Sequence, residues 1–300
     1  MENKIDKSEI IFLYESKYSI PNGDPFTGEQ RYDEETKKVL VSDVRIKRNI
    51  RNYLEKQGLQ IFVTDNTEKG ITDAKGMLNF LAEKTGEKDI LKVLQSCIDV
   101  RLFGGISTLE KDKALTNTHV NITGPVQFAL LNPSLNKSNL RIHQNTTHFS
   151  SKEGKGQGSI GTTSLVPYTL CQIQGWINPY VAEDSGLKSN DLDLMFKALW
   201  YSTNGTEYTR TKSNQHAILL LQIVYNQPND KIYGTDRLIR METEKQEEEI
   251  RSMQDDFTLD FKRLVEISTS GKVKEIRFFT EIEEIEKQLT SVDKFKKLLL

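Results

Sequence analysis

The sequence predicts an α+β fold whose strands and helices follow the order β-α-β-β-α-β. Two long apolar runs, residues 10–18 and 216–225, are rich in β-branched and aromatic side chains and predict buried strands. An amphipathic helix follows the first run, and a second helix, residues 190–201, precedes the last one. The polar stretch at residues 132–164 separates the two halves as a long insertion.

The composition is that of a soluble globular protein with a modest core and long polar segments, since 36% of the 300 residues are hydrophobic and 28% are charged. No run approaches the eighteen or so apolar residues of a membrane-spanning helix. Residues 1–9 are polar and mixed in charge, unlike a signal peptide. Cys97 and Cys171 suggest neither a disulfide framework nor a metal site, so we expect a cytoplasmic protein with reduced thiols.

The charges are unevenly distributed although the net charge is only −2. Residues 37–56 contain seven Lys or Arg against two acids, and residues 242–260 contain eight acids against two bases. A basic segment of this kind can bind phosphate while the rest of the chain stays near neutral. The alternative is that both segments are ordinary solvated surfaces, with the acidic segment forming an exposed helix face.

The first predicted helix begins after Ser42, a good N-cap, and stops near Gly58. Apolar residues at positions 46, 50, 53 and 54 form one stripe that faces a sheet. Arginine offers a planar set of donors that matches phosphate oxygens, so the remaining surface is a candidate nucleic-acid contact. Opposite the stripe lie Arg45, Arg48 and Asn52, with Lys47 and Arg51 on its flank.

The other predicted elements follow the same patterns. Residues 132–164 have few large apolar groups, so we expect an extended loop or hairpin that becomes ordered on a ligand. The remaining predictions are a short extended piece at 39–41, a strand at 59–64, helices at 74–84 and 89–100, a break at 102–105, a strand at 120–131 distorted near Gly124 and Pro125, a strand at 165–178, and a terminal helix at 281–300.

Two further segments could contact single-stranded nucleic acid. In DVRLFGG, Arg101 stands beside Gly104 and Gly105, which let a backbone approach a ligand closely, although a helix C-cap explains the glycines as well. The 132–164 segment carries basic and aromatic groups suited to stacking or wedging against bases, with a plain surface loop as the alternative. These groups are His143, His148, Phe149, Lys152 and Lys155.

Signs of catalysis are weak. The four histidines show no metal-binding spacing, and no nucleophile elbow is present. Gly154-Lys155-Gly156 lacks the spacing of a phosphate-binding loop. Asp24 and Asp33 lie in the loop before the basic helix and could serve a metal-free RNA cleavage, but Asp24 fits a turn residue better. We therefore expect no catalysis, no cofactor and no metal.

An ordered set of segments resembles a known family. The segments FLYESKYSIPNGDP, VSDVRIKRNIRNYLEK, DVRLFGG, ITGPVQF and LVPYTLCQIQGWI resemble the backbone subunit of type I CRISPR effector complexes, the seventh-numbered CRISPR-associated family, in its subtype I-B/I-C branch. The resemblance covers residues from about 10 to 226. Its most specific part is the NGDP turn followed by the DVRxKRxIR helix.

The resemblance implies an RRM-like, ferredoxin-like palm with inserted helical fingers and an extended thumb hairpin. The palm would comprise residues 8–64, 118–131 and 165–226, the helical insertion 65–117, the thumb 132–164, and a C-terminal extension 227–300. Copies would stack head to tail along a CRISPR guide RNA, with each thumb kinking the strand. The other implied partners are target DNA through the guide and further Cascade subunits, with no membrane.

The resemblance also implies roles for single residues. Members of the type I family are not nucleases, and the thumb here departs from the family in having few large apolar residues. Two alternatives remain, a type III-like RNA-guided ribonuclease backbone using Asp24 or Asp33, and a free-standing single-stranded RNA-binding protein. The implied guide contacts are Asn22, Ser42, Arg45, Lys47, Arg48, Arg51, Arg101, Gly104 and Gly105, with His143 to Lys155 in the thumb.

Overall fold

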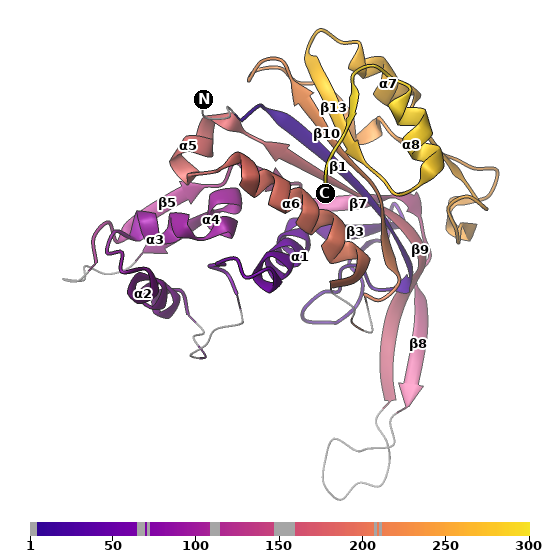
Figure 1. Cartoon of the computed structure of the whole chain (residues 1–300). Coiled ribbons are helices and arrows are strands. Elements are labelled where there is room, and N and C mark those ends of the chain that lie inside the picture. Colours follow the sequence, from indigo (N-terminus) through magenta and orange to yellow (C-terminus); the bar gives the residue numbers. More distant parts are fainter. Residues whose placement is uncertain are drawn as a thin grey trace, which may run out of the picture.

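The computed structural model describes residues 5–64, 70, 73–108, 115–146, 160–206, 209 and 212–300. A seven-stranded sheet forms the centre of the protein, in the order β14-β13-β10-β1-β9-β6, with β8 paired to β9 (Figure 1). β1 pairs antiparallel with both β9 and β10, which confirms the three long predicted strands. The strands of this sheet are β1 (Ser8–Ser19), β6 (Val126–Phe128), β8 (Arg141–Thr146), β9 (Ile160–Ile177), β10 (Gln215–Tyr225), β13 (Val273–Phe279) and β14 (Phe295–Lys297).

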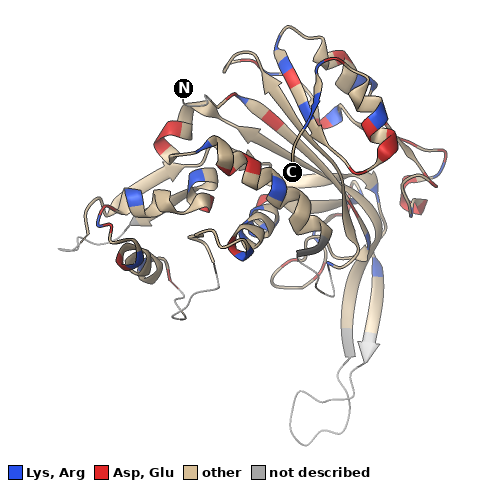
Figure 2. Cartoon of the chain, in the orientation of Figure 1, with Lys and Arg blue, Asp and Glu red and all other residues tan. Residues whose placement is uncertain are grey.

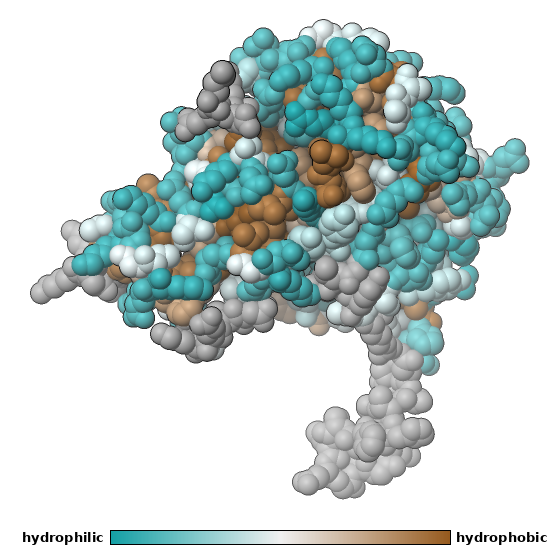
Figure 3. Space-filling view, viewed as in Figure 1, coloured by the Kyte–Doolittle hydropathy of each residue, from teal (hydrophilic) through white to brown (hydrophobic). Residues whose placement is uncertain are grey.

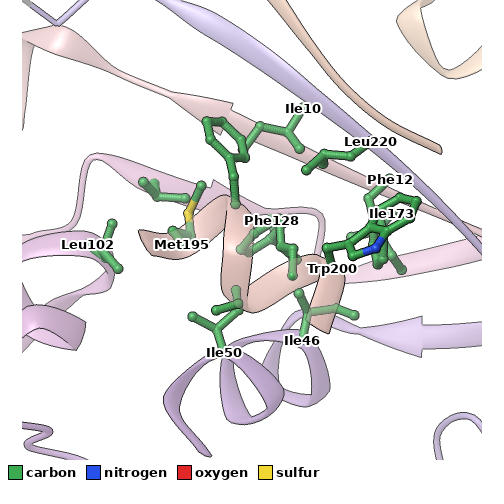
Figure 4. Close-up of a cluster of buried hydrophobic side chains, with 14 of the residues drawn as sticks. Ile10, Phe12, Ile46, Ile50, Leu102, Phe128, Ile173, Met195, Trp200 and Leu220 are labelled. Carbon is green, nitrogen blue, oxygen red and sulfur yellow. The ribbon is translucent and has the colours of Figure 1, made fainter. Parts of the chain in front are cut away.

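Two helices, α1 (Asp43–Lys56) and α6 (Ser189–Tyr201), cover one face of the sheet (Figure 1). Successive residues of a strand point to opposite faces, so Ile10 and Phe12 of β1 face these helices. They pack with Ile46 and Ile50 of α1 and with Trp200 of α6 in one apolar core (Figure 4). The predicted amphipathic stripe of the first helix is thereby confirmed.

The C-terminal part of the chain covers the opposite face. Ile11 and Leu13 of β1 pack there against Leu264 and Leu289 in a second core. Because both faces are covered, ligands can approach the central strands only at the edges and ends of the sheet. The elements of this covering layer are β11 (Arg240–Glu242), β12 (Thr258–Asp260), α7 (Lys262–Ser268) and α8 (Glu283–Thr290).

Two expectations for this C-terminal part are wrong. The terminal helix ends at Thr290, and the chain continues into β14, parallel to β13, because Phe295 is buried against Phe278. The acidic residues 242–260 form no α-helix: they run from the end of β11 to its antiparallel partner β12 through turns and one short 3-10 helix, Glu247–Glu249. Figure 3 shows a hydrophobic patch around the C-terminus, where Leu298–Leu300 line a cavity of about 190 Å³.

The helical insertion has a small core of its own, to which Leu81, Leu94 and Val100 contribute. The predicted helix at 89–100 is divided at Cys97, whose backbone is extended. The predicted strand at 120–131 is interrupted at Gly124, as expected. The elements here are α2 (Ala74–Thr85), α3 (Ile90–Ser96), α4 (Ile98–Phe103), β4 (Gly104–Thr108), β5 (His119–Thr123) and, before α6, α5 (Ala182–Ser185).

Residues 59–64 do not form the predicted strand. The backbone N–H groups of Phe62 and Val63 donate to the carboxylate of Asp99, at 2.8 and 3.1 Å. A side chain thus supplies the acceptors that a neighbouring strand would otherwise provide, and the segment runs irregularly over α4.

The polar insertion contains more strand than the sequence predicts. β7 (Leu131–Lys137) pairs with β3 (Lys38–Ser42), which also pairs with β2 (Tyr32–Asp33). β8 and the first residues of β9 form a two-stranded ribbon that extends away from the body of the protein (Figure 1). In the described part of the chain no helix is long and apolar enough to cross a membrane.

Candidate nucleic-acid interface

The N-terminus of α1 is fixed by the turn that follows β1. Ser42 caps the helix, and its hydroxyl accepts from the N–H of Arg45 at 3.4 Å. Asn22 Oδ1 accepts from the N–H and the hydroxyl of Ser42, at 2.6 and 2.8 Å. The N–H of Asn22 in turn donates to Gln30 Oε1 at 2.9 Å. Asn22 is 5% exposed, so its described contacts orient the helix from beneath the surface.

Two of the predicted phosphate contacts on α1 are engaged in ion pairs. Lys47 Nζ lies 3.0 Å from Asp43 Oδ2. Arg51 Nε lies 2.9 Å from Asp99 Oδ2, and its guanidinium stands over the ring of Phe103 at 5.3 Å. Asp99 is fully buried, so Arg51 neutralises a carboxylate that would otherwise be unpaired in the core. This pair joins α1 to α4.

Arg45 and Arg48 lie off the apolar stripe, and both are half-buried. Figure 2 shows Lys and Arg positions recurring along α1. Burial raises the pKa of the Tyr14 hydroxyl well above its ordinary value, and the charge of Arg45 acts in the opposite direction. The guanidinium of Arg45 therefore lies near Tyr14, in the middle of β1. Helical geometry places Arg48 on the side of α1 directly opposite Ile46 and Ile50. These two arginines, with the N-terminus of α1, form the basic surface of the helix.

Arg101 is held in a bidentate ion pair. Its Nε and one terminal nitrogen lie 2.8 Å from the two carboxylate oxygens of Asp191, and the other terminal nitrogen donates to the carbonyls of Gln95 and Ser96. The side chain of Arg101 is 12% exposed. The pair joins α4 to α6, so these contacts hold the fold together, and the phosphate contact of Arg101 stays a prediction.

Gly104 and Gly105 allow close approach between parts of the chain itself. Gly104 has a φ of +86°, and a Cβ on it would lie 2.4 Å from the carbonyl oxygen of Ile122. A Cβ on Gly105 would lie 3.2 Å from Val100. The glycines therefore permit β4 and β5 to pack beside α4. Gly104 is also the C-cap residue of α4, which is the alternative that the sequence left open.

The ribbon presents basic and polar side chains to solvent. Arg141 and His143 are exposed on β8, and Ile142 between them is 75% exposed. Arg141 pairs with Leu165 at the base of the ribbon, and His143 pairs with Thr163. Four other predicted thumb residues lie outside the described residues: His148, Phe149, Lys152 and Lys155.

The two candidate catalytic carboxylates stabilise turns. Asp24 accepts from the N–H of Phe26 at 2.9 Å, and this bond, with others, lowers its pKa. Asp33 accepts from the hydroxyl of Thr36 at 2.6 Å, which lowers its pKa in the same way. Both are therefore ionised at neutral pH and engaged locally. Within the described ranges no cluster of three or more His, Cys, Asp or Glu could hold a metal ion.

Sequence reasoning missed Asp99 and Asp191, the acids that engage two of the predicted phosphate-binding arginines. Asp99 stands between Ile98 and Val100 in an otherwise apolar segment. An acid in such a run is a signal of a buried carboxylate that needs a cation, and it could have identified the pair with Arg51. Asp191 gives no comparable signal, because the exposed residues Ser189 and Asn190 precede it.

Comparisons with known proteins identify the family of this chain. Residues 6–262 match the family model described as CRISPR-associated protein Cas7. The CRISPR-associated protein Cas7 of Haloferax volcanii is 26% identical over 283 residues, which cover 87% of this chain and 82% of that protein.

The first of two solved structures compared shows a similar fold. A chain from a structure described as "CRISPR RNA-guided surveillance complex, pre-nicking" is 12% identical, with a TM-score of 0.51 and coverage of 97% of this chain and 95% of that one. A chain from a "CRISPR RNA-guided surveillance complex" is 14% identical, with a TM-score of 0.48 and coverage of 93% and 90%. Since the family model spans most of the sequence, the protein belongs to the CRISPR-associated protein Cas7 family.

Proposed function

We propose that the protein is a non-catalytic, cytoplasmic CRISPR RNA-binding backbone subunit of a type I Cascade surveillance complex, in the subtype I-B/I-C branch. Copies would polymerise head to tail along the guide RNA spacer and hold it for base pairing with target DNA in antiviral defence. The observation that carries this proposal is the family match over residues 6–262, which includes the basic helix and the ribbon.

The central strands support an RRM-like palm. The order β10-β1-β9-β6 is antiparallel throughout, with α1 and α6 on one face. A ferredoxin-like β-α-β-β-α-β unit has this 4-1-3-2 order. The palm would comprise residues 8–64, 118–131 and 165–226, with fingers at 65–117, a thumb at 132–164 and the extension at 227–300. Because the extension covers the sheet face opposite the helices, RNA would bind along α1 and the ribbon.

Phosphate binding would combine two features of α1. The first turn of a helix presents backbone N–H groups and the positive end of its dipole to an anion. Arg45 and Arg48 would add charge along the same surface. Asn22 and Arg51 would act as positioning residues, since one fixes the helix N-terminus and the other its packing on α4. Sequence information would come from base pairing, so the protein need only hold the backbone of the guide.

The absence of catalysis is supported by the state of Asp24 and Asp33. A general base for RNA cleavage works best with a pKa near the working pH. Hydrogen bonds lower the pKa of both carboxylates and bind them into their own turns. This arrangement favours a structural subunit over the ribonuclease alternative.

The proposal is tested by producing the chain together with a CRISPR guide RNA and measuring its absorbance ratio at nucleic-acid and protein wavelengths before and after high salt. We expect bound RNA at low salt that is lost at high salt, because phosphate contacts release counterions. Size-exclusion chromatography should show several copies per RNA. A single copy on a long RNA, or no RNA at low ionic strength, would contradict the proposal.

A further inference from the structure

Tyr18 has an unusual backbone conformation at the end of β1. Its φ is +45°, in the left-handed region, and its side chain is 58% exposed. A bulky residue rarely adopts this conformation, because its Cβ crowds the neighbouring carbonyl. Strain of this kind persists where the surrounding structure imposes it, and it is concentrated at functional sites.

Neighbouring residues hold Tyr18 in place. The N–H of Lys17 donates to the carbonyl of Asn214 at 3.0 Å, and Asn214 Nδ2 donates to the carbonyl of Lys17 at 2.9 Å. On the β9 side, Lys17 pairs with Tyr168 and Ser19 pairs with Val166. Pro167, which lies between these two residues of β9, has no N–H to donate. Asn214 itself has a φ of +90°. The exposed ring is therefore presented by a fixed backbone.

The position of Tyr18 relates it to the ribbon. Ser19 pairs with Val166 of β9. Leu165, which precedes Val166 in the chain, pairs with Arg141 as the first pair of the ribbon. Lys17 precedes Tyr18, but its Nζ lies 2.9 Å from Glu15 Oε1 and over the ring of Tyr168, so the exposed cation at this level of the sheet is Arg141. On the other side, the chain runs within four residues to Asn22 and the N-terminus of α1.

A fixed, exposed aromatic ring near the base of a ribbon that carries an exposed arginine suits a nucleobase. Bases of single-stranded RNA stack on aromatic side chains regardless of sequence, while nearby cations hold the phosphates. A ring that is already ordered loses little conformational freedom on binding. We infer that Tyr18 is a stacking platform for an unpaired base of single-stranded RNA at the base of the ribbon. This inference rests on the proposed RNA-binding function.

The test uses Tyr18→Trp as a fluorescent reporter, with a uridine homopolymer as the probe. The chain already contains Trp176 and Trp200, so the unmodified protein supplies the background. We expect the added emission to be quenched on RNA binding. Tyr18→Phe should bind as the parent does, and Tyr18→Leu should bind roughly 5- to 100-fold more weakly.

Tyr18→Gly separates stacking from folding. Glycine adopts a positive φ without strain, so this variant should unfold at a denaturant concentration no lower than the parent while binding RNA as weakly as Tyr18→Leu. Tyr233 supplies the matched control, since it is 90% exposed and its ring lies over Arg237 in the C-terminal extension. Tyr233→Trp and Tyr233→Leu should change neither quenching nor affinity.

Each outcome decides one point. If the parent binds the uridine homopolymer and all Tyr18 variants bind equally well without quenching, the stacking inference is overturned and the proposed function stands. If the parent does not bind RNA at low ionic strength, the proposed function fails and the inference falls with it. Quenching at Tyr233→Trp equal to that at Tyr18→Trp would also overturn the inference.

Discussion

The side-chain oxygen of Asn22 accepts two hydrogen bonds from Ser42, one from the backbone N–H at 2.6 Å and one from the hydroxyl at 2.8 Å. These contacts join the turn after β1 to the cap of α1, twenty positions later in the chain. The NGDP turn and the basic helix are therefore one structural unit, and Asn22 acts on any ligand of the helix through Ser42.

Replacing Asn22 with Ala should destabilise the fold. The N–H and hydroxyl of Ser42 would lose their acceptor in a largely buried place, which costs on the order of 1–3 kcal/mol. Urea denaturation measures the change, with Asn229→Ala as the control, because Asn229 accepts a single hydrogen bond from Tyr180 at the surface. An unchanged urea midpoint would show that the contact does not hold the helix.

Arg51 and Arg48 should respond differently to removal although they lie three residues apart on α1. Arg51→Ala leaves Asp99 buried without its cation, and breaking a buried pair costs about 3–5 kcal/mol. Arg48→Ala should cost less stability than Arg51→Ala, because Arg48 lies opposite the apolar stripe, and it should weaken RNA binding. Thermal unfolding and RNA-binding titrations on the same samples separate the two effects.

A rescue variant tests the cause of the Arg51 effect. Asp99→Asn removes the buried charge and keeps one side-chain oxygen, which can accept from the N–H of Phe62 or of Val63 but not from both, since these donate to different oxygens of Asp99. The double variant Arg51→Ala with Asp99→Asn should therefore recover part of the lost stability. A double variant less stable than Arg51→Ala alone would mean that the charge of Asp99 is not the cause.

Local features were predictable from the sequence. Ser42 and the stripe of Ile46 and Ile50 lie within one helix, and their spacing alone determines the packed face. The partners of Arg51 and Arg101 were not predictable, because Asp99 and Asp191 are 48 and 90 residues away. Both arginines therefore looked like phosphate contacts.

The strand predicted at residues 59–64 was wrong for the same reason, namely a partner that is distant in the sequence. Its apolar residues fit a strand, but the backbone donors of Phe62 and Val63 bind a carboxylate of α4 that no local pattern reveals. The terminal helix at 281–300 was too long for a related reason. Phe295 is buried in the core beside β13. This tertiary contact, and not a local helix preference, determines the conformation of the last residues.

Acid should weaken the fold partly through Asp24. The N–H of Phe26 holds the pKa of this carboxyl below its ordinary value of 3.8. The ionised form therefore stabilises the native state above that value, and the contribution disappears as the pH falls through the lower folded-state pKa. Asp24→Asn should flatten the decline of the urea midpoint below about pH 4. An identical decline in both proteins would contradict this assignment.

Asp24→Ala and Asp33→Ala should leave the chemistry of an assembled complex unchanged. We expect complementary RNA to remain intact with the parent and with both variants, because the two carboxylates stabilise turns. Gel analysis of labelled target RNA checks this. Regularly spaced cuts that disappear in either variant would establish the ribonuclease alternative.

Reversing the charge of the basic surface should abolish RNA binding. Arg45→Glu with Arg48→Glu places repulsion along the phosphate path, and both positions lie off the apolar stripe, so the native circular dichroism spectrum should be retained. Lys262→Glu is the matched control, since Lys262 is exposed on α7 in the covering layer. Unfolding of the double variant would mean that these arginines support the core.

Photocrosslinking tests the central claim most directly. RNA containing 4-thiouridine is bound to the protein, irradiated, and the attached peptides are identified by mass spectrometry. We predict crosslinks within Asp43–Lys56 of α1 and Arg141–Thr146 of β8. Crosslinks confined to the C-terminal extension, with none on α1 or the ribbon, would contradict the account.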